Sequence, residues 1–266
     1  MMNLFIRELK ANRKSLLLWG IGIIFMVVAG MGKYESISGS GQSLNEIMQQ
    51  MPKSLQAIMG TGSLDLSKAV DYYGVLFLYL VLMGSIHALM LGANIIAKEE
   101  RDKTAEFLMV KPISRTGIVT AKLAAAAVHV ILFNIMTFIT SISAVAYYNK
   151  GTVPTGDIII LMVGMFILQL IFLFLGTGIA AASKHPKSAA ALGTAILLLT
   201  FILSIMIDLN SKLEDLKYLT PFKYYEAKQM LADGALDPVF IVLSVVIIGV
   251  LFSVTYICFK RKDMNV

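Results

Sequence analysis

The sequence predicts an all-α membrane protein with six transmembrane helices. Of its 266 residues, 57% are hydrophobic and only 15% are charged, and the mean hydropathy is +0.76. Soluble domains average about 45–50% apolar and about 25% charged residues, so these values favour a chain solvated mainly by lipid. A transmembrane helix needs about 20 mostly apolar residues. Six such runs lie at residues 15–32, 72–97, 117–148, 158–183, 188–207 and 240–259, which predicts one transmembrane domain over residues 1–266.

Residues 1–14, before the first apolar run, mix apolar and basic side chains. This pattern predicts a short helix that lies at the membrane interface before the chain turns into the bilayer. An ordinary basic flank that only fixes orientation is the alternative. A cleaved signal peptide has a similar pattern, but residues 30–33 match a small-residue cleavage site poorly, and five more apolar runs follow. We therefore expect the first run to remain as a span.

The distribution of basic residues among the loops predicts how the spans are oriented. If both termini lie in the cytoplasm, 15 of the 23 Lys and Arg residues fall on the cytoplasmic side, as the positive-inside rule requires. An aromatic belt at the opposite surface is expected from Tyr72, Tyr73, Tyr147 and Tyr148. The sequence thus predicts a multi-pass protein of the cell membrane with cytoplasmic termini.

Two segments are expected on the extracellular side, at residues 33–71 and 209–238. Within the first, apolar residues recur at helical spacing over residues 44–59, which predicts a surface helix interrupted at Pro52. Its simplest role is packing on the bundle, with substrate contact as the alternative because methionine-rich faces adapt to varied partners. The second segment carries too many charges to span, and residues 226–232 have a helical pattern.

Residues 98–115, between the second and third runs, predict a short helix that projects into the cytoplasm. Its charged start extends the second span, whereas Phe107 and Leu108 would face water unless a partner covered them. Pro112 ends this helix, and Ser114 is placed to cap the next one. Such a helix is typical of a docking element for a cytoplasmic partner. A solvated connector between spans is the alternative.

The sequence lacks the motifs of several enzyme and binding classes. It contains no phosphate-binding loop, no His-Glu-x-x-His and no Gly-x-Ser-x-Gly. A single cysteine, Cys258, excludes a disulfide within the chain. No stretch interleaves aromatic and basic residues as a nucleic-acid surface would. We therefore expect no enzymatic activity, no cofactor or metal bound by this chain, and no nucleic-acid partner.

Polar residues inside the apolar runs are few. Hydrogen bonding between helices, rather than ligand binding, is the expected role of His87, His129, Asn134 and Gln169. Carriers driven by ion gradients place charged residues deep in the membrane. Here Lys122 and Asp208 lie near the ends of runs, where they are expected to reach the interface. This pattern argues against a proton- or sodium-coupled carrier.

With these features the chain resembles the permease subunit of type-2 ABC transporters, the six-span exporter type. Its strongest match is to the loop pattern Glu-Arg-x-Gly-Thr-x-Glu-x-Leu-x-x-x-Pro-x-Ser-Arg followed by Lys. The matching residues are Glu99, Glu100, Arg101, Thr104, Glu106, Leu108, Pro112, Ser114, Arg115 and Lys122. Lys103 stands where the family often has glycine. Two shorter matches are Leu219-Thr220-Pro221-Phe222-Lys223-Tyr224 and the basic tail at residues 260–263.

The resemblance implies that residues 98–115 form a coupling helix that enters a groove on a separate ABC ATPase subunit. The coupling residues would be Glu99, Glu100, Arg101, Thr104, Glu106, Phe107, Leu108, Pro112, Ser114 and Arg115. Residues 1–14 would form the interfacial connecting helix. The extracellular segment containing Pro221, Phe222, Tyr224 and Tyr225 would close the exit path.

The same resemblance implies the partners and the reaction cycle. Two copies of this chain, or one copy and a related permease, would pair with two ATPase subunits that bind ATP and Mg²⁺. The chain itself would export a substrate through the lipid-surrounded bundle without catalysing a reaction. The alternative is a polytopic sensor or assembly protein that docks a cytoplasmic partner without transport. A peptide, a lipid or an ion would all be compatible with apolar walls.

Overall fold

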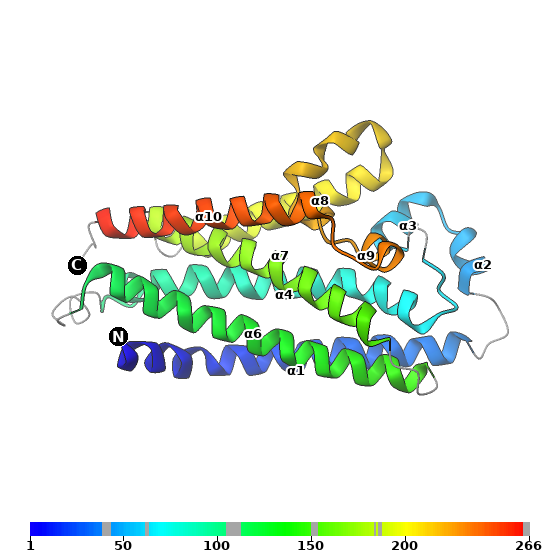
Figure 1. The fold of residues 1–266 in the computed structure, drawn as a ribbon, viewed down its shortest axis with the longest axis horizontal. Coiled ribbons are helices and arrows are strands. Elements are labelled where there is room, and N and C mark those ends of the chain that lie inside the picture. The colour runs from blue at the N-terminus through cyan, green and yellow to red at the C-terminus, as the bar shows by residue number, and fades with distance from the viewer. Residues whose placement is uncertain are drawn as a thin grey trace.

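The computed structural model describes residues 1–38, 44–61, 64–104, 113–149, 154–183, 185 and 188–262. These residues form helices joined by short connections, with no β-strand among them (Figure 1). Six of the helices are long and apolar enough to cross a membrane. They are α1 (Met2–Ser38), α4 (Ala69–Arg101), α6 (Arg115–Tyr148), α7 (Thr155–Ala182), α8 (Ala189–Leu209) and α10 (Pro238–Arg261). The prediction of an all-α chain with six spans is confirmed.

The shorter helical segments lie at one end of the bundle, opposite the two chain termini (Figure 1). They are α2 (Leu44–Gln49), α3 (Lys53–Met59), η1 (Ser211–Leu219), η2 (Pro221–Lys223) and α9 (Ala227–Asp233). We call this the far end, and the end with both termini the terminal end. The predicted interruption at Pro52 separates α2 from α3. Helix α3 ends at Gly60, whose φ of 68° is a left-handed conformation that glycine adopts readily.

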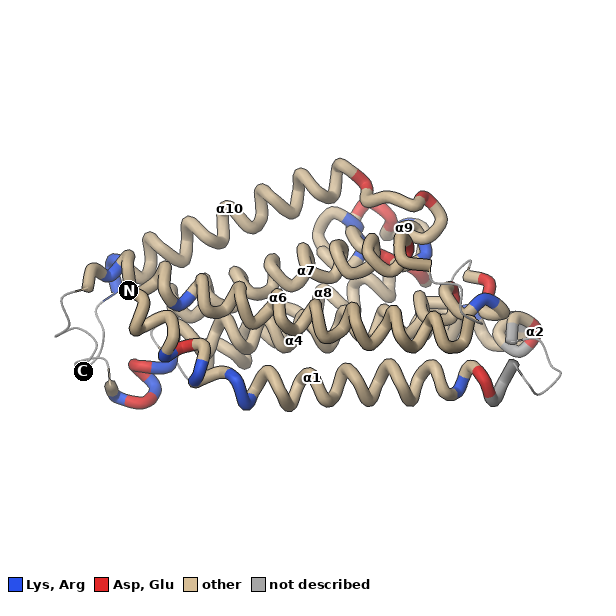
Figure 2. Tube along the Cα trace, turned by 60° about the horizontal axis from the view of Figure 1, so that its bottom comes forward, with Lys and Arg blue, Asp and Glu red and all other residues tan. Residues whose placement is uncertain are grey.

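Charged residues gather at the two ends of the bundle, and the parts of the helices between these ends carry very few (Figure 2). This arrangement suits a hydrocarbon layer around the middle of the helices, because lipid cannot solvate charge. The apolar outer surface has the same origin. Exposed apolar residues on α1, α8 and α10 include Leu18, Phe25, Leu199, Val242 and Val245. The chain is therefore a multi-pass membrane protein.

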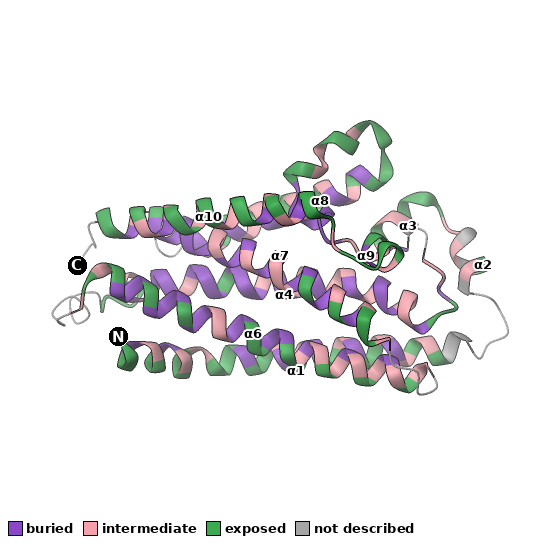
Figure 3. Ribbon diagram, in the orientation of Figure 1, coloured by how far each residue is buried: buried purple, intermediate pink, exposed green. Residues whose placement is uncertain are grey.

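Helices α4 and α7 form the centre of the bundle and share its most extensive helix–helix contact. In their most apolar windows 61% and 56% of residues are buried, against 22%, 22% and 17% in α1, α8 and α10. Figure 3 shows the same difference, with long exposed faces along α1 and α10. The central pair positions both ends of the molecule, since α1, α6, α8 and α10 pack around it.

Glycines allow the close approach of α4 and α7. A Cβ atom added to Gly92 would lie 2.3 Å from the carbonyl oxygen of Leu173. One added to Gly176 would lie 2.3 Å from the carbonyl oxygen of Leu89. Neither helix can carry a side chain at these points, because the partner's backbone occupies the space. Small residues serve the same purpose in other transmembrane helix pairs.

The start of α1 differs from the sequence-based expectation. Residues 1–14 were expected to form a separate interfacial helix followed by a turn, but α1 continues without interruption from Met2 to Ser38. Two properties explain this. No Gly or Pro occurs before Gly20 to break the helix. In addition, Leu4 and Glu8, one helical turn apart, are buried, which holds the segment against the bundle.

Candidate functional site

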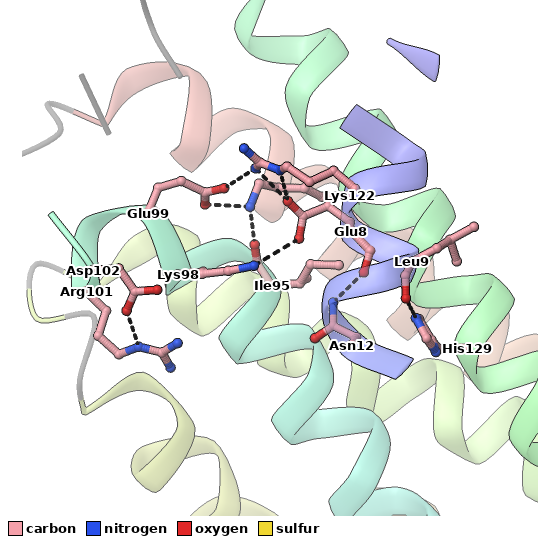
Figure 4. Close-up of polar contacts among 11 residues, drawn as sticks. Glu8, Leu9, Asn12, Ile95, Lys98, Glu99, Arg101, Asp102, Lys122 and His129 are labelled. Atoms are coloured by element: carbon pink, nitrogen blue, oxygen red, sulfur yellow. Dashed lines mark hydrogen bonds and ion pairs between the residues drawn. The ribbon is translucent and has the colours of Figure 1, made fainter. Parts of the chain in front are cut away.

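A buried carboxylate, Glu99, joins three helices at the terminal end (Figure 4). Helix α4 continues past its apolar run, which places Glu99 between α1 and α6. Its Oε2 lies 2.6 Å from Nζ of Lys122 on α6, and its Oε1 lies 2.9 Å from Nη2 of Arg7 on α1. The Lys122 ammonium also donates to the carbonyl oxygen of Ile95. One side chain thus fixes the relative positions of α1, α4 and α6.

Glu8 extends this arrangement along α1. Its Oε1 lies 2.7 Å from Nη2 of Arg7, and its Oε2 lies 3.9 Å from Nζ of Lys98. We define the Glu99 cluster as Arg7, Glu8, Lys98, Glu99 and Lys122. Glu8 and Lys122 are fully buried, so their charges depend on partners within the cluster rather than on water.

The burial of Lys122 corrects the expectation that it reaches the membrane interface. Its side chain is inaccessible to solvent. The physical reason is that Glu99 and the Ile95 carbonyl oxygen, one helical turn apart on α4, both lie within reach of its ammonium. Pairing inside the bundle therefore replaces contact with water and lipid headgroups. The apolar pattern of α6 gave no indication of this partner.

A second group of contacts attaches the C-terminal end of α10 to the same region. Lys262 Nζ lies 2.7 Å from Oε2 of Glu100 and donates to the carbonyl oxygen of Ala180 at 3.1 Å. The Arg115 guanidinium donates to the carbonyl oxygens of Lys260 and Lys262 at 3.0 and 2.8 Å. These bonds connect α10 to α4, α6 and α7. The basic tail is therefore held by specific contacts.

The structure brings together only part of the predicted coupling set. Glu99, Glu100 and Arg115 make contacts between helices, whereas Arg101 pairs with its neighbour Asp102 at 3.1 Å and Thr104 is exposed. The predicted cap is confirmed, since Ser114 Oγ accepts from the Gly117 amide at 3.1 Å. Four predicted residues lie outside the described residues: Glu106, Phe107, Leu108 and Pro112.

Sequence reasoning left Arg7, Glu8 and Lys262 out of the site. Glu8 could have been noticed because it is an acidic residue in an otherwise basic segment. For Lys262 the signal was its place directly after an apolar run. Neither pattern identifies a partner, because the partners are about 90 to 160 residues away along the chain.

The backbone conformation at Lys103 explains why the family pattern often has glycine at this position. Its φ of 54° makes it the one non-glycine residue with positive φ among the described residues. The amide of Thr104 bonds to the Glu99 carbonyl oxygen at 2.8 Å and that of Lys103 to the Glu100 carbonyl oxygen at 3.3 Å. This pair of bonds is the Schellman ending of α4, which favours glycine at the Lys103 position.

Replacing Lys103 with glycine is expected to stabilise the protein by about 1 kcal/mol, because the left-handed conformation costs a side-chain-bearing residue about that much. The matched change Asp102→Gly should destabilise, since Asp102 has an ordinary φ of −89°. Thermal unfolding of the purified chain in detergent measures both. A lower unfolding temperature for Lys103→Gly than for the wild type would contradict the interpretation that the Lys103 backbone is strained.

At the far end, the predicted exit segment is buried among three spans. Phe222 packs against Phe172 of α7 and Phe201 of α8, with ring centroids 5.2 Å apart in each pair. Tyr224 stacks on Phe240 of α10 at 4.8 Å. The remaining members, Pro221 and Tyr225, are buried too, and the Tyr225 hydroxyl lies 2.8 Å from Ser244 Oγ.

Charged residues attach this segment to the end of α8. Asp208 Oδ1 lies 2.7 Å from Nζ of Lys223 and 2.8 Å from Nζ of Lys228. Glu226 pairs with the same two lysines, at 3.1 Å for Lys228. We define the far-end cluster as Asp208, Lys223, Glu226 and Lys228.

The pKa values of two side chains at the far end are raised. Burial acts to lower the pKa of Lys228, but Glu226 and Asp208 outweigh it and raise this pKa above its ordinary value. Lys228 therefore stays charged. Burial raises the pKa of Tyr224 to about 12, so its hydroxyl keeps a proton to donate to the Tyr218 carbonyl oxygen.

Three of the four polar side chains predicted to bond between helices do so, whereas Nδ1 of the fourth, His87, is buried without a hydrogen-bond partner. The amide of Asn134 on α6 donates to Gln169 Oε1 on α7. His129 Nε2 lies 3.2 Å from the Leu9 carbonyl oxygen of α1 (Figure 4). His87 stacks on Phe133 at a centroid distance of 4.7 Å. Within the described ranges, no group of three or more His, Cys, Asp or Glu residues could hold a metal ion.

Comparison with known proteins places these observations in a family. None of the curated proteins matches the chain. A family model described as ABC-2 family transporter protein matches residues 2–264, which is nearly the whole chain. Members of this family are membrane subunits that associate with an ABC ATPase and are not ATPases themselves. The chain therefore belongs to the ABC-2 transporter family and is a permease component of an ABC transporter.

Proposed function

We propose that this chain is the permease half of an exporter in the cell membrane, with both termini in the cytoplasm. A separate ABC ATPase subunit binds ATP and Mg²⁺ and drives the cycle. Two copies of the chain, or one copy and a related permease, complete the transporter. The Glu99 cluster is the observation that carries this proposal, because it ties three helices together where the chain enters residues 105–112.

The cluster gives a physical route from the ATPase to the spans. The proposed docking element is the coupling segment, residues 98–115, which includes the last turn of α4 and the start of α6. Glu99 and Arg115 belong to this segment and move with it. Glu99 is bound to α1 and α6, and Arg115 to the end of α10. A displacement of this segment is therefore distributed over four spans.

The far-end segment is the proposed gate. Pro221, Phe222, Tyr224 and Tyr225 fill the space between α7, α8 and α10 in this conformation. When the spans move, these aromatic contacts must separate for a substrate to leave. Orientation is supported by the bias of Lys and Arg toward the terminal end, where 15 of 23 are expected.

Reversing the charge of Glu106 tests this function. The Glu106→Lys permease should reach the membrane and fold normally, but it should no longer stimulate ATP hydrolysis by the partner ATPase. The reason is that a lysine would oppose a charge-matched contact in the ATPase groove. Hydrolysis is measured on the co-purified complex in lipid nanodiscs, with and without the permease.

Asp215→Lys is the matched control, because Asp215 is an exposed carboxylate in η1 at the far end. It should leave stimulation unchanged. If Glu106→Lys stimulated ATP hydrolysis as the wild type does, the assignment of residues 98–115 as the coupling segment would be wrong. Failure of any ABC ATPase to co-purify with the wild-type chain would favour the sensor or assembly role instead.

A further inference from the structure

Two cavities meet at the far-end cluster. One, of about 320 Å³, lies between α3, α4, α8 and the segment from Phe222 to Lys228. The other, of about 330 Å³, lies between η1, α9 and the start of α10. Asp208, Glu226 and Lys228 line both of them. The ion pairs among these residues therefore lie between the two spaces and form a wall that both share.

The first cavity, which we call the apolar cavity, has a hydrophobic floor that faces the membrane-spanning part of the bundle. Its floor consists of Phe77, Leu78, Val81, Ile205 and Phe222. A hydrocarbon group entering this space would leave water and contact aliphatic and aromatic side chains. The charged residues of its lining are Lys53, Lys228, Asp208 and Glu226, and the two carboxylates are already paired with lysines.

The second cavity, which we call the acidic cavity, has the opposite character. Its lining contains five carboxylates and three amines. The carboxylates are Asp208, Glu214, Glu226, Asp233 and Asp237. This excess of negative charge attracts cations to the mouth of the pair of cavities.

The two lysines of the wall are not equivalent. The side chain of Lys223 is 7% exposed, whereas that of Lys228 is 28% exposed. Lys223 is therefore part of the packed segment, while Lys228 can swing into solvent without leaving a buried charge. When Lys228 moves away, Asp208 and Glu226 remain paired with Lys223. The place that the Lys228 ammonium held can then be taken by another amine.

We propose that the two cavities form one binding site for a cationic amphiphile, whose apolar chain fills the apolar cavity and whose ammonium group replaces Lys228 beside Asp208 and Glu226. Charge at the wall is conserved in this exchange, because one ammonium leaves and another enters. This proposal rests on the proposed function in one respect: the amphiphile is the class of substrate exported only if the chain is an exporter with its exit gate at the far end.

A binding measurement on the full-length permease tests the site. The probes are radiolabelled decylamine and decylsulfonate, which share a chain length and differ in the sign of the head group. The permease is held in nanodiscs of zwitterionic phosphatidylcholine, and empty nanodiscs correct for partition into lipid. Decylamine should bind saturably, and decylsulfonate should not.

Three variants separate the two halves of the site. Lys228→Met removes the competing ammonium and should tighten decylamine binding about tenfold, whereas Glu226→Gln should weaken it about tenfold. Ile205→Trp fills the apolar cavity and should abolish binding. Its control is Met206→Trp, on the neighbouring exposed position, which should bind like the wild type.

Several results would overturn the assignment. Equal binding of both probes would remove the charge selectivity, and unchanged decylamine affinity in Lys228→Met or in Ile205→Trp would remove the site. Size-exclusion profiles confirm that each variant is folded. No ATPase or nucleotide is present, so a negative result leaves the proposed function intact, and loss of ATPase coupling leaves the binding site intact.

Discussion

Glu99→Ala is expected to destabilise the permease by about 3–5 kcal/mol, the cost of leaving a buried charge without its partner. Lys122 is fully inaccessible and has Glu99 as its carboxylate at 2.6 Å. Without it, the ammonium would remain buried with no carboxylate beside it, which is unfavourable. Arg7 would lose its contact with α4 as well. Chemical unfolding in detergent, followed by helical circular dichroism, gives the change in free energy.

Two controls distinguish this effect from a general loss of charge. Glu214→Ala removes an exposed partner of Lys217 and should change stability by less than about 1 kcal/mol. The double change Glu99→Leu with Lys122→Met replaces the buried pair by apolar side chains and should restore most of the stability. A Glu99→Ala variant as stable as the Glu214→Ala control would refute the buried-pair interpretation.

The double variant also separates stability from coupling. Its helices should pack normally, but α1 would no longer be bound through Arg7 to α4. Stimulated ATP hydrolysis should therefore fall although the protein is folded. Wild-type stimulation by this variant would remove the Glu99 cluster from the transmission route while leaving its structural role in place.

Gly92→Ala and Gly176→Ala are expected to have the second largest effect, a destabilisation of about 3 kcal/mol or more. A methyl group at either position would lie 2.3 Å from a backbone carbonyl oxygen of the other central helix. Backbone cannot move aside as a flexible side chain can, so α4 and α7 must separate along their whole contact. Thermal unfolding and the yield of folded protein both report this change.

Gly249→Ala in α10 is the matched control, because nothing lies within 4 Å of the added methyl group. It should stabilise the helix by about 0.5–1 kcal/mol, the usual advantage of alanine over glycine. The two classes of substitution therefore differ in sign. Destabilisation of equal size at Gly92 and Gly249 would indicate that the effect is local to the helix rather than due to helix contact.

The spans were predictable because lipid imposes a simple rule on sequence. Each span needs a long apolar run, and all six runs became helices. The capping role of Ser114 and the helix break at Pro52 were predictable for a related reason, since they depend on local backbone chemistry. The spans, the cap and the helix break therefore depend only on residues that are close to one another in the sequence.

The Glu99 cluster was not predictable to the same extent, because its members are distant in sequence. Lys122 sits in an apolar helix where hydropathy alone suggests contact with the interface. Its real environment depends on how α4 lies beside α6. The continuity of α1 has a similar cause, since Glu8 is buried by the packing of α1 against the other helices, where it lies near Lys98 of α4. Pairing between helices is therefore the information that a linear pattern lacks.

The unbroken course of α1 has a mechanical consequence. Its 37 residues correspond to a rod about 55 Å long at 1.5 Å per residue. One end is bound to α4 through Arg7, and near the other the Tyr72 hydroxyl bonds to the Gly30 carbonyl oxygen at 3.3 Å and the Tyr34 hydroxyl to that of Ser67 at 2.7 Å. Attached at both ends to α4 and the residues just before it, such a rod can neither shorten nor tilt independently of α4. A movement imposed on α1 and α4 at one membrane surface must then be carried as one unit to the other.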